Sequence, residues 1–209
     1  MRVKIKICGI TREEDALAAA TAGADALGFN FYARSPRCLT PERAARIVSV
    51  VPANVIKVAV FVNPTAETVR RLLDAVPVDV LQFHGDETAE FCESFAVPYM
   101  KAVNVRDRAP EGLPVLHPRA CAWLLDAYAP DMKGGTGRTF DWSVWPRDIE
   151  RRLVLAGGLT PANVADAVTT TRPYGVDVAG GVEGPERGVK DAAKMNRFVE
   201  EARRAAAEI

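Results

Sequence analysis

The stretch Lys6-Ile7-Cys8-Gly9-Ile10-Thr11 joins an apolar run to an alanine-rich segment, and this junction sets the pattern of the chain. The β-branched residues at 3, 5 and 7 alternate with lysines, which is typical of a β-strand, and Cys8-Gly9 ends the run in a tight turn. Thr11 followed three residues later by Glu14 is a capping box, so a helix should begin at Thr11. The sequence therefore places the Cys8 thiol between a strand end and a helix start.

Cys8 has two interpretations at this position. A free cysteine is commonly buried and acts as a small hydrophobic residue, and position alone leaves that structural role open. The positive end of a helix dipole would instead lower the pKa of a thiol and raise its thiolate fraction near neutral pH. A general base or a nucleophile is then possible.

Length and composition limit the class of protein. The chain has 209 residues, which suits a single domain spanning 1–209. Lys plus Arg and Asp plus Glu both total 27, and no basic run occurs, so nucleic-acid binding is disfavoured. The four cysteines form no C-x-x-C pair and the two histidines are far apart, so we expect neither a disulfide framework nor a metal site.

No apolar segment has the length of a membrane span, and no secretory leader is expected at the N-terminus. A cytoplasmic protein that does not insert into membranes is the simplest expectation.

Eight short apolar runs alternate with helical segments. The expected strands span 3–8, 24–31, 56–62, 80–83, 99–105, 121–125, 153–156 and 175–178. Thr40-Pro41 and Thr160-Pro161 each offer an N-cap with proline at the first helical position. Three prolines and a glycine within 106–119 would interrupt the fifth helix. Eight βαβ-type repeats favour a closed (β/α)8 TIM barrel, small and single-domain, over an open doubly wound sheet, with the fifth helix missing or irregular.

In such a barrel the C-terminal ends of the strands carry the active site. Cys8, Arg37, His84 and Asp126 all fall at these ends. Asp126 could cap a helix or, opposite a thiol, supply the acid of an acid and base pair. Arg37 could bind a carboxylate with two nitrogens or remain solvated, and His84 could orient a substrate or be an ordinary turn residue.

Two Gly-Gly turns follow the last two expected strands, Gly157-Gly158 after the seventh and Gly180-Gly181 after the eighth. One such pair is most often only a turn. Two on neighbouring strands are typical of a phosphate site, because backbone N–H groups can approach an anion closely there. We therefore predict that both turns bind phosphate.

The glycine-rich segment Gly134 to Thr139 does not complete a nucleotide-binding motif. Met132 and Arg138 replace the first glycine and the lysine of a phosphate loop, and Phe140 stands where a dinucleotide fingerprint has its third glycine. We interpret the segment as a loop that closes over substrate.

Taken together, these features resemble the phosphoribosylanthranilate isomerase family of tryptophan biosynthesis. The resemblance covers almost the whole chain and rests on KICGIT (6–11), SPR (35–37), FVNP (61–64), QFHG (82–85), LLD (124–126), GGTGRTFDW (134–142), AGGL (156–159), GVDV (175–178) and GVE (181–183). In one departure, the family usually has Ser-Ser where this chain has Ala179-Gly180. A hydroxyl contact to phosphate would be lost there, whereas backbone donors would remain.

The resemblance implies an Amadori rearrangement of N-(5-phosphoribosyl)anthranilate to 1-(2-carboxyphenylamino)-1-deoxyribulose 5-phosphate. Asp126 would act as general acid on the ring oxygen and Cys8 as general base at C2 of the sugar. Arg37 would bind the anthranilate carboxylate, and His84 and Asp177 would contact the substrate. An iminium intermediate is its own electron sink, so no metal and no cofactor are expected. The partner would be this small molecule alone, and the protein would act as a monomer or homodimer.

Two other functions remain open. The analogous isomerase of histidine biosynthesis shares the fold and the chemistry, but its base after the first strand is an aspartate and not a thiol. A non-catalytic sugar-phosphate-binding barrel would keep the glycine turns but would not need Cys8 and Asp126 together.

Overall fold

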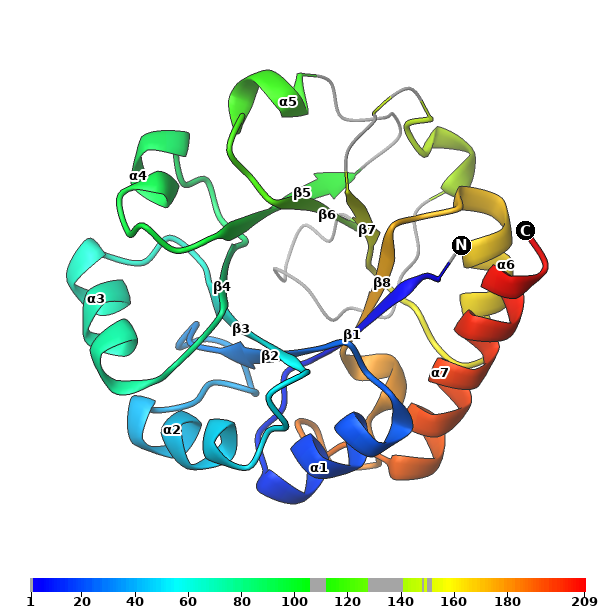
Figure 1. Cartoon of the computed structure of the whole chain (residues 1–209), viewed down its shortest axis with the longest axis horizontal. Coiled ribbons are helices and arrows are strands. Elements are labelled where there is room, and N and C mark those ends of the chain that lie inside the picture. Colours follow the sequence, from blue (N-terminus) through cyan, green and yellow to red (C-terminus); the bar gives the residue numbers. More distant parts are fainter. Residues whose placement is uncertain (1, 106–111, 128–140, 148, 150–151) are drawn as a thin grey trace.

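The computed structural model describes residues 2–105, 112–127, 141–147, 149 and 152–209. Eight parallel strands pair in sequence order, and β8 pairs with β1 to close a barrel with the helices outside it (Figure 1). The strands are β1 (Lys4–Cys8), β2 (Ala26–Asn30), β3 (Ile56–Phe61), β4 (Val80–Phe83), β5 (Tyr99–Val105), β6 (Ala122–Ala127), β7 (Leu153–Leu155) and β8 (Gly175–Val178). The predicted (β/α)8 barrel is confirmed.

The helices follow the strands around the barrel. They are α1 (Glu13–Ala22), α2 (Pro41–Ser49), α3 (Ala66–Ala75), α4 (Ala89–Glu93), α5 (Leu113–Leu116), α6 (Val164–Thr171) and α7 (Ala192–Ala207). Two 3₁₀ turns, η1 (Trp142–Val144) and η2 (Gly180–Val182), lie before β7 and after β8. The fifth helix is reduced to one turn, as the prolines of that segment predict.

Helix starts were predicted with mixed success. Thr40 caps α2, because its hydroxyl accepts a hydrogen bond from a backbone N–H of the first turn. The capping prediction for Thr11 is wrong, since α1 begins at Glu13 and Thr11 Oγ1 donates instead to Gly188 O at 2.6 Å. The prediction for Thr160 is also wrong, because α6 has Asn163 at its N-cap. Both hydroxyls found other partners in the folded chain.

Side-chain alternation along the strands divides the apolar residues into two cores. The larger core lies between the strands and the helices and includes Ile5, Ile7, Phe83 and Trp123. The barrel interior is filled by smaller clusters, one of which contains Cys8, Val58 and Val60, and another Met100, Ala102, Ala122, Leu124, Val154 and Ala156. Lys6 shares the interior face of β1 with Cys8 because the two residues are two positions apart.

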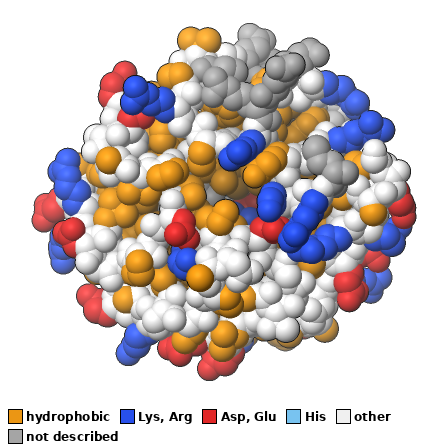
Figure 2. Space-filling view, viewed as in Figure 1, with side chains coloured by type: hydrophobic (Ala, Val, Ile, Leu, Met, Phe, Trp, Pro, Cys, Tyr) orange, Lys and Arg blue, Asp and Glu red, His pale blue; other side chains and the backbone are white. Residues whose placement is uncertain are grey.

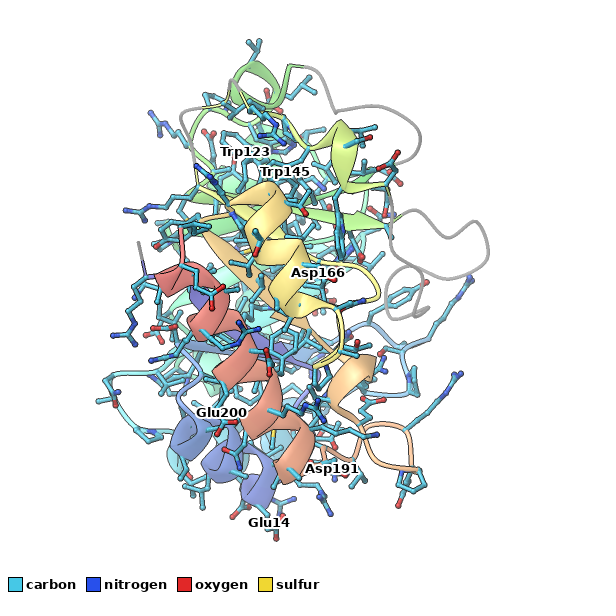
Figure 3. All side chains as sticks on the ribbon, turned by 90° about the vertical axis from the view of Figure 1, so that its right-hand side faces the viewer. Glu14, Trp123, Trp145, Asp166, Asp191 and Glu200 are labelled. Atoms are coloured by element: carbon cyan, nitrogen blue, oxygen red, sulfur yellow. The ribbon has the colours of Figure 1, made fainter. Side chains whose placement is uncertain are left out.

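One flank of the barrel is covered by α6, α7 and α1, which lie side by side in Figure 3. Asp166 belongs to α6 and Glu200 to α7, and Glu14 lies near the start of α1. These helices cover β7, β8 and β1, where the barrel closes.

The surface carries charges of both signs. On the face shown in Figure 2, basic and acidic side chains are interspersed around the rim. Within the described parts of the chain, no helix is both long and apolar enough to cross a bilayer.

Candidate active site

A cavity of about 380 Å³ opens at the C-terminal ends of β6, β7 and β8. It brings together residues that the sequence predicts for a site but that are far apart along the chain. Its lining contains both Gly-Gly turns, together with Arg37, Asp126, Asp177, Glu183 and Arg187. Because the strands are parallel, side chains at their carboxyl ends meet at one face of the barrel.

The two glycine turns pack against neighbouring backbone. Gly157 has a φ of +85°, and a Cβ there would collide with the backbone nitrogen of Ala127. A Cβ on Gly181 would collide with the carbonyl oxygen of Leu159 in the preceding loop. The loops after β7 and β8 therefore touch at Gly181, which requires a residue without a side chain.

Asp126 and His84 form a close pair in this cavity region. Asp126 is the penultimate residue of β6, and its side chain is 8% exposed. His84 directly follows β4, and its Nε2 lies 3.2 Å from Asp126 Oδ2. The two groups are near but poorly aligned, so among the described residues Nε2 makes no hydrogen bond. On its other side, His84 Nδ1 lies 3.2 Å from Gln82 Nε2.

The loop that carries His84 is fixed by a buried carboxylate. Glu87 accepts hydrogen bonds from Asn63 N at 2.7 Å, from Gly85 N at 3.0 Å and from Lys101 Nζ at 3.2 Å. Lys101 Nζ also donates to Gly85 O at 2.7 Å. A buried charge that is paired and hydrogen-bonded on several sides holds its loop in one arrangement. His84 is therefore presented to Asp126 from a rigid support.

Cys8 ends β1 inside the barrel and is 8% exposed. It forms a buried apolar cluster with Val58 and Val60, and Ala179, which lines the cavity, packs against this cluster. Burial raises the pKa of the Cys8 thiol, and the nearby Lys6 ammonium opposes that rise. The predicted lowering of this pKa by a helix N-terminus is wrong, because the thiol lies among apolar side chains and α1 begins only at Glu13.

Arg37 is held by an acidic partner from the other end of the chain. Its Nε and Nη2 donate to Glu183 Oε1 at 2.6 Å and Oε2 at 2.9 Å. Lys190 Nζ reaches the same carboxylate at 3.2 Å. Burial alone would raise the pKa of Glu183, but the hydrogen bonds and charges of Arg37 and Lys190 lower it. Arg37 thus lines the cavity in a fixed orientation.

Several site residues escaped the sequence analysis. Lys6 and Gln82 could have been found from strand alternation, which places both on the interior face of the barrel. Glu183, Arg187 and Lys190 carry no local signal, because only the fold brings them to the cavity and its surroundings. The second histidine, His117, lies outside the lining of the cavity and is buried with its Nδ1 3.3 Å from the Tyr99 hydroxyl.

The predicted closing loop at 134–139 lies outside the described residues. Within the residues that are described, no group of three or more His, Cys, Asp or Glu side chains is arranged to hold a metal ion.

Comparison with known proteins identifies the family. The model of the N-(5'-phosphoribosyl)anthranilate (PRA) isomerase family matches residues 5–201. An N-(5'-phosphoribosyl)anthranilate isomerase from Pseudomonas fluorescens is 52% identical over 94% of this chain and 97% of its own length.

Solved structures of phosphoribosyl anthranilate isomerases also resemble this chain. The phosphoribosyl anthranilate isomerase of Thermotoga maritima aligns with a TM-score of 0.83 and 41% identity over 96% of this chain and 98% of that one. A phosphoribosyl anthranilate isomerase in complex with reduced 1-(o-carboxyphenylamino)-1-deoxyribulose 5-phosphate aligns with a TM-score of 0.80 and 39% identity over the same shares. The chain belongs to the N-(5'-phosphoribosyl)anthranilate isomerase family.

Proposed function

We propose that this protein catalyses the Amadori rearrangement of N-(5-phosphoribosyl)anthranilate to 1-(2-carboxyphenylamino)-1-deoxyribulose 5-phosphate. The observation that carries the proposal is the shared cavity: a buried carboxylate, two glycine turns and an oriented arginine line one space, and the buried cluster that contains Cys8 packs against Ala179 of its wall. We further propose that the protein acts on this small molecule in the cytoplasm, as a monomer or homodimer.

The first chemical step opens the sugar ring. The Asp126 carboxyl group gives its proton to the furanose oxygen as the bond from C1 to that oxygen breaks, and the anthranilate nitrogen forms an iminium with C1. The developing Asp126 carboxylate lies beside His84 Nε2, which can donate a hydrogen bond to it. His84 would therefore stabilise the acid after proton transfer.

The second step moves a proton from C2. The Cys8 thiolate takes that proton, and the electron pair of the broken bond flows into the iminium to give an enolamine. Tautomerisation of the enolamine yields the C2 ketone, so the product is an isomer of the substrate. The iminium accepts the electron pair, so the reaction needs no external oxidant or reductant.

The two ends of the substrate carry the charges that fix its orientation. The phosphate would bind at Gly157-Gly158 and Gly180-Gly181, where η2 begins and where Arg187 also lines the cavity. Ala179 supplies no hydroxyl there, so backbone N–H groups and the arginine would carry the contact. Arg37 would bind the anthranilate carboxylate, and Asp177 would contact the sugar hydroxyls from β8.

The test follows the loss of anthranilate fluorescence when the purified protein meets freshly generated N-(5-phosphoribosyl)anthranilate. We expect rapid turnover by the wild type and a fall in kcat of about 10²- to 10⁴-fold in Cys8→Ala and in Asp126→Asn, because each removes one proton-transfer group. Cys121→Ala and Asp79→Asn are the matched controls, since Cys121 lies before β6 and Asp79 is an exposed residue that pairs with Lys57.

The outcomes separate the parts of the proposal. Undiminished activity in Cys8→Ala would move the base to another residue while sparing the reaction. A wild type that does not turn over this substrate would contradict the proposed function, and the histidine-pathway aminoaldose would then be the next substrate to assay.

A further inference from the structure

Lys6 is a buried cation at the base of the site. Its Nζ donates to Asp177 Oδ1 at 2.9 Å, and the two residues are register partners in β1 and β8. The Lys6 side chain is 5% exposed and the Asp177 side chain 9%, while Asp177 also lines the cavity. Burying such a pair is costly and stabilises a fold only weakly, so its position beside the cavity calls for a functional explanation.

The same ammonium group also reaches Cys8. Lys6 and Cys8 point into the barrel from one face of β1, opposite Gly28 of β2. A Cβ on Gly28 would lie 2.6 Å from Cys8 Sγ and 3.2 Å from Lys6 Nζ, so both groups fill the space that the missing side chain leaves. The Lys6 ammonium and the Cys8 thiol therefore lie beside one another, and the positive charge of Lys6 acts on the thiol.

Four charged groups act on the Cys8 thiol from the elements around it. Lys6 on β1 and Lys190, before α7, favour the thiolate, and Asp177 on β8 opposes it. The charge of Arg37, in the loop after β2, is also coupled to Cys8. Burial raises the pKa of the thiol most strongly, and among the groups that counter this rise Lys6 comes first.

The charges around Cys8 favour its ionised form, whereas burial opposes ionisation and keeps the pKa of the thiol above its ordinary value. Arg37 and Lys190 share the Glu183 carboxylate, and Lys6 is paired with Asp177. This cluster therefore holds three cations against two carboxylates, and a thiolate at Cys8 makes it neutral. A buried cluster without net charge avoids the large cost of an uncompensated ion.

We propose that Lys6 is a positioning residue for the reaction, whose ammonium stabilises the thiolate form of Cys8 and fixes Asp177 Oδ1 at the wall of the substrate cavity. The catalytic part of this inference rests on the proposed role of Cys8 as the base. In the proton transfer Cys8 becomes a thiol while Lys6 keeps its proton, so Lys6 itself is neither acid nor base.

The decisive measurement is the pH dependence of Cys8 alkylation by iodoacetamide, followed by mass spectrometry of the peptide that contains Cys8. Only the thiolate reacts, so the midpoint reports the ionisation of this thiol without any need for turnover. In Lys6→Met we expect the midpoint to rise by at least about one pH unit, which makes alkylation about tenfold slower at a pH below both midpoints. Lys6→Arg should keep most of the wild-type profile.

Lys4→Met is the matched control, because Lys4 lies on the same strand but is half exposed and pairs with Asp25. Its alkylation profile should overlay that of the wild type. If Lys6→Met does not fold because Asp177 is left unpaired, Lys6→Met/Asp177→Asn removes both charges. The midpoint should still lie above the wild-type value, since the charge of Lys6 acts on Cys8 more strongly than that of Asp177.

An unchanged midpoint in a folded Lys6 variant would overturn the inference. In turnover, kcat of Lys6→Met should fall, and the acidic limb of its pH profile should move to higher pH. Lys6→Arg should restore part of kcat and part of the wild-type profile. A shifted midpoint with unchanged turnover would also overturn the role in the reaction. Activity retained by Cys8→Ala would instead refute the proposed base, whatever the alkylation shows.

Discussion

His84 connects the acid side of the site to the barrel interior. Its ring stands between Asp126 Oδ2 and Gln82 Nε2, at 3.2 Å from each. If the Gln82 amide donates to Nδ1, the ring proton is on Nε2, the nitrogen nearer to the carboxylate. A hydrogen bond in this direction from Gln82 of β4 would therefore favour the tautomer that suits a role beside Asp126.

We predict that His84→Ala lowers kcat about 10- to 100-fold, because it removes the hydrogen bond that Nε2 would donate to the Asp126 carboxylate after proton transfer, and a hydrogen bond to a charged group contributes about 1.5–3 kcal/mol. The fluorescence assay measures this loss, and His117→Ala, at the other histidine, should leave kcat at the wild-type value. In an Asp126→Asn background His84→Ala should cost little more, since the two groups act as a unit. Fully additive losses would show that His84 works independently of Asp126.

At the scale of elements, the loops after β7 and β8 form one unit. Gly181 touches the Leu159 carbonyl of the neighbouring loop, and the η2 turn starts at Gly180. The loop after β2 joins this unit through Arg37 and Glu183. Three loops that are distant in sequence are thereby held in register around one cavity.

Gly181→Ala should therefore disturb the proposed phosphate site. The new methyl group would collide with the Leu159 carbonyl, and the neighbouring loop could make room only if the glycine turn moved. We therefore expect KM to rise at least about tenfold. Binding of inorganic phosphate, measured by calorimetry, should weaken in parallel. Gly184→Ala is the matched control, because the nearest atom to a Cβ there lies at 3.9 Å. Wild-type phosphate affinity in Gly181→Ala would contradict the site.

At the scale of the whole molecule, stability comes mainly from the core between barrel and helices. Phe83 of β4 is fully buried in it, and its ring centroid lies 6.2 Å from that of Phe61, 5.8 Å from Phe91, 6.1 Å from Phe95 and 6.2 Å from Tyr99. This aromatic cluster ties β3, β4 and β5 to α4. It lies on the outer face of the strands, away from the interior residues of the site.

Phe83→Ala should lower the free energy of unfolding by about 3–5 kcal/mol, because it removes a large buried ring and leaves a cavity. Urea denaturation followed by circular dichroism measures the change. Val115→Ala, at a residue that is 82% exposed, should alter it by less than about 0.5 kcal/mol. A loss below about 1 kcal/mol in Phe83→Ala would mean that the core around this ring repacks.

Local patterns were sufficient for the fold and for part of the site. The strands 80–83, 99–105 and 175–178 were predicted with the bounds that the structure shows. A strand and its turn are determined by residues close together in sequence, so Cys8, Asp126 and the two glycine pairs could be placed at strand ends from sequence alone. Because parallel strands share one direction, this also implied that they meet at one face.

The partners of these residues were decided only by the closed barrel. Lys6 binds Asp177 and Arg37 binds Glu183, although the residues of each pair lie far apart in the sequence. Thr11 does not cap a helix as predicted and instead donates a hydrogen bond to the distant Gly188. Periodicity indicates which face a side chain takes but not which group lies opposite it. The direction of the Cys8 pKa shift has the same origin, because burial and neighbouring charge are properties of the packed interior.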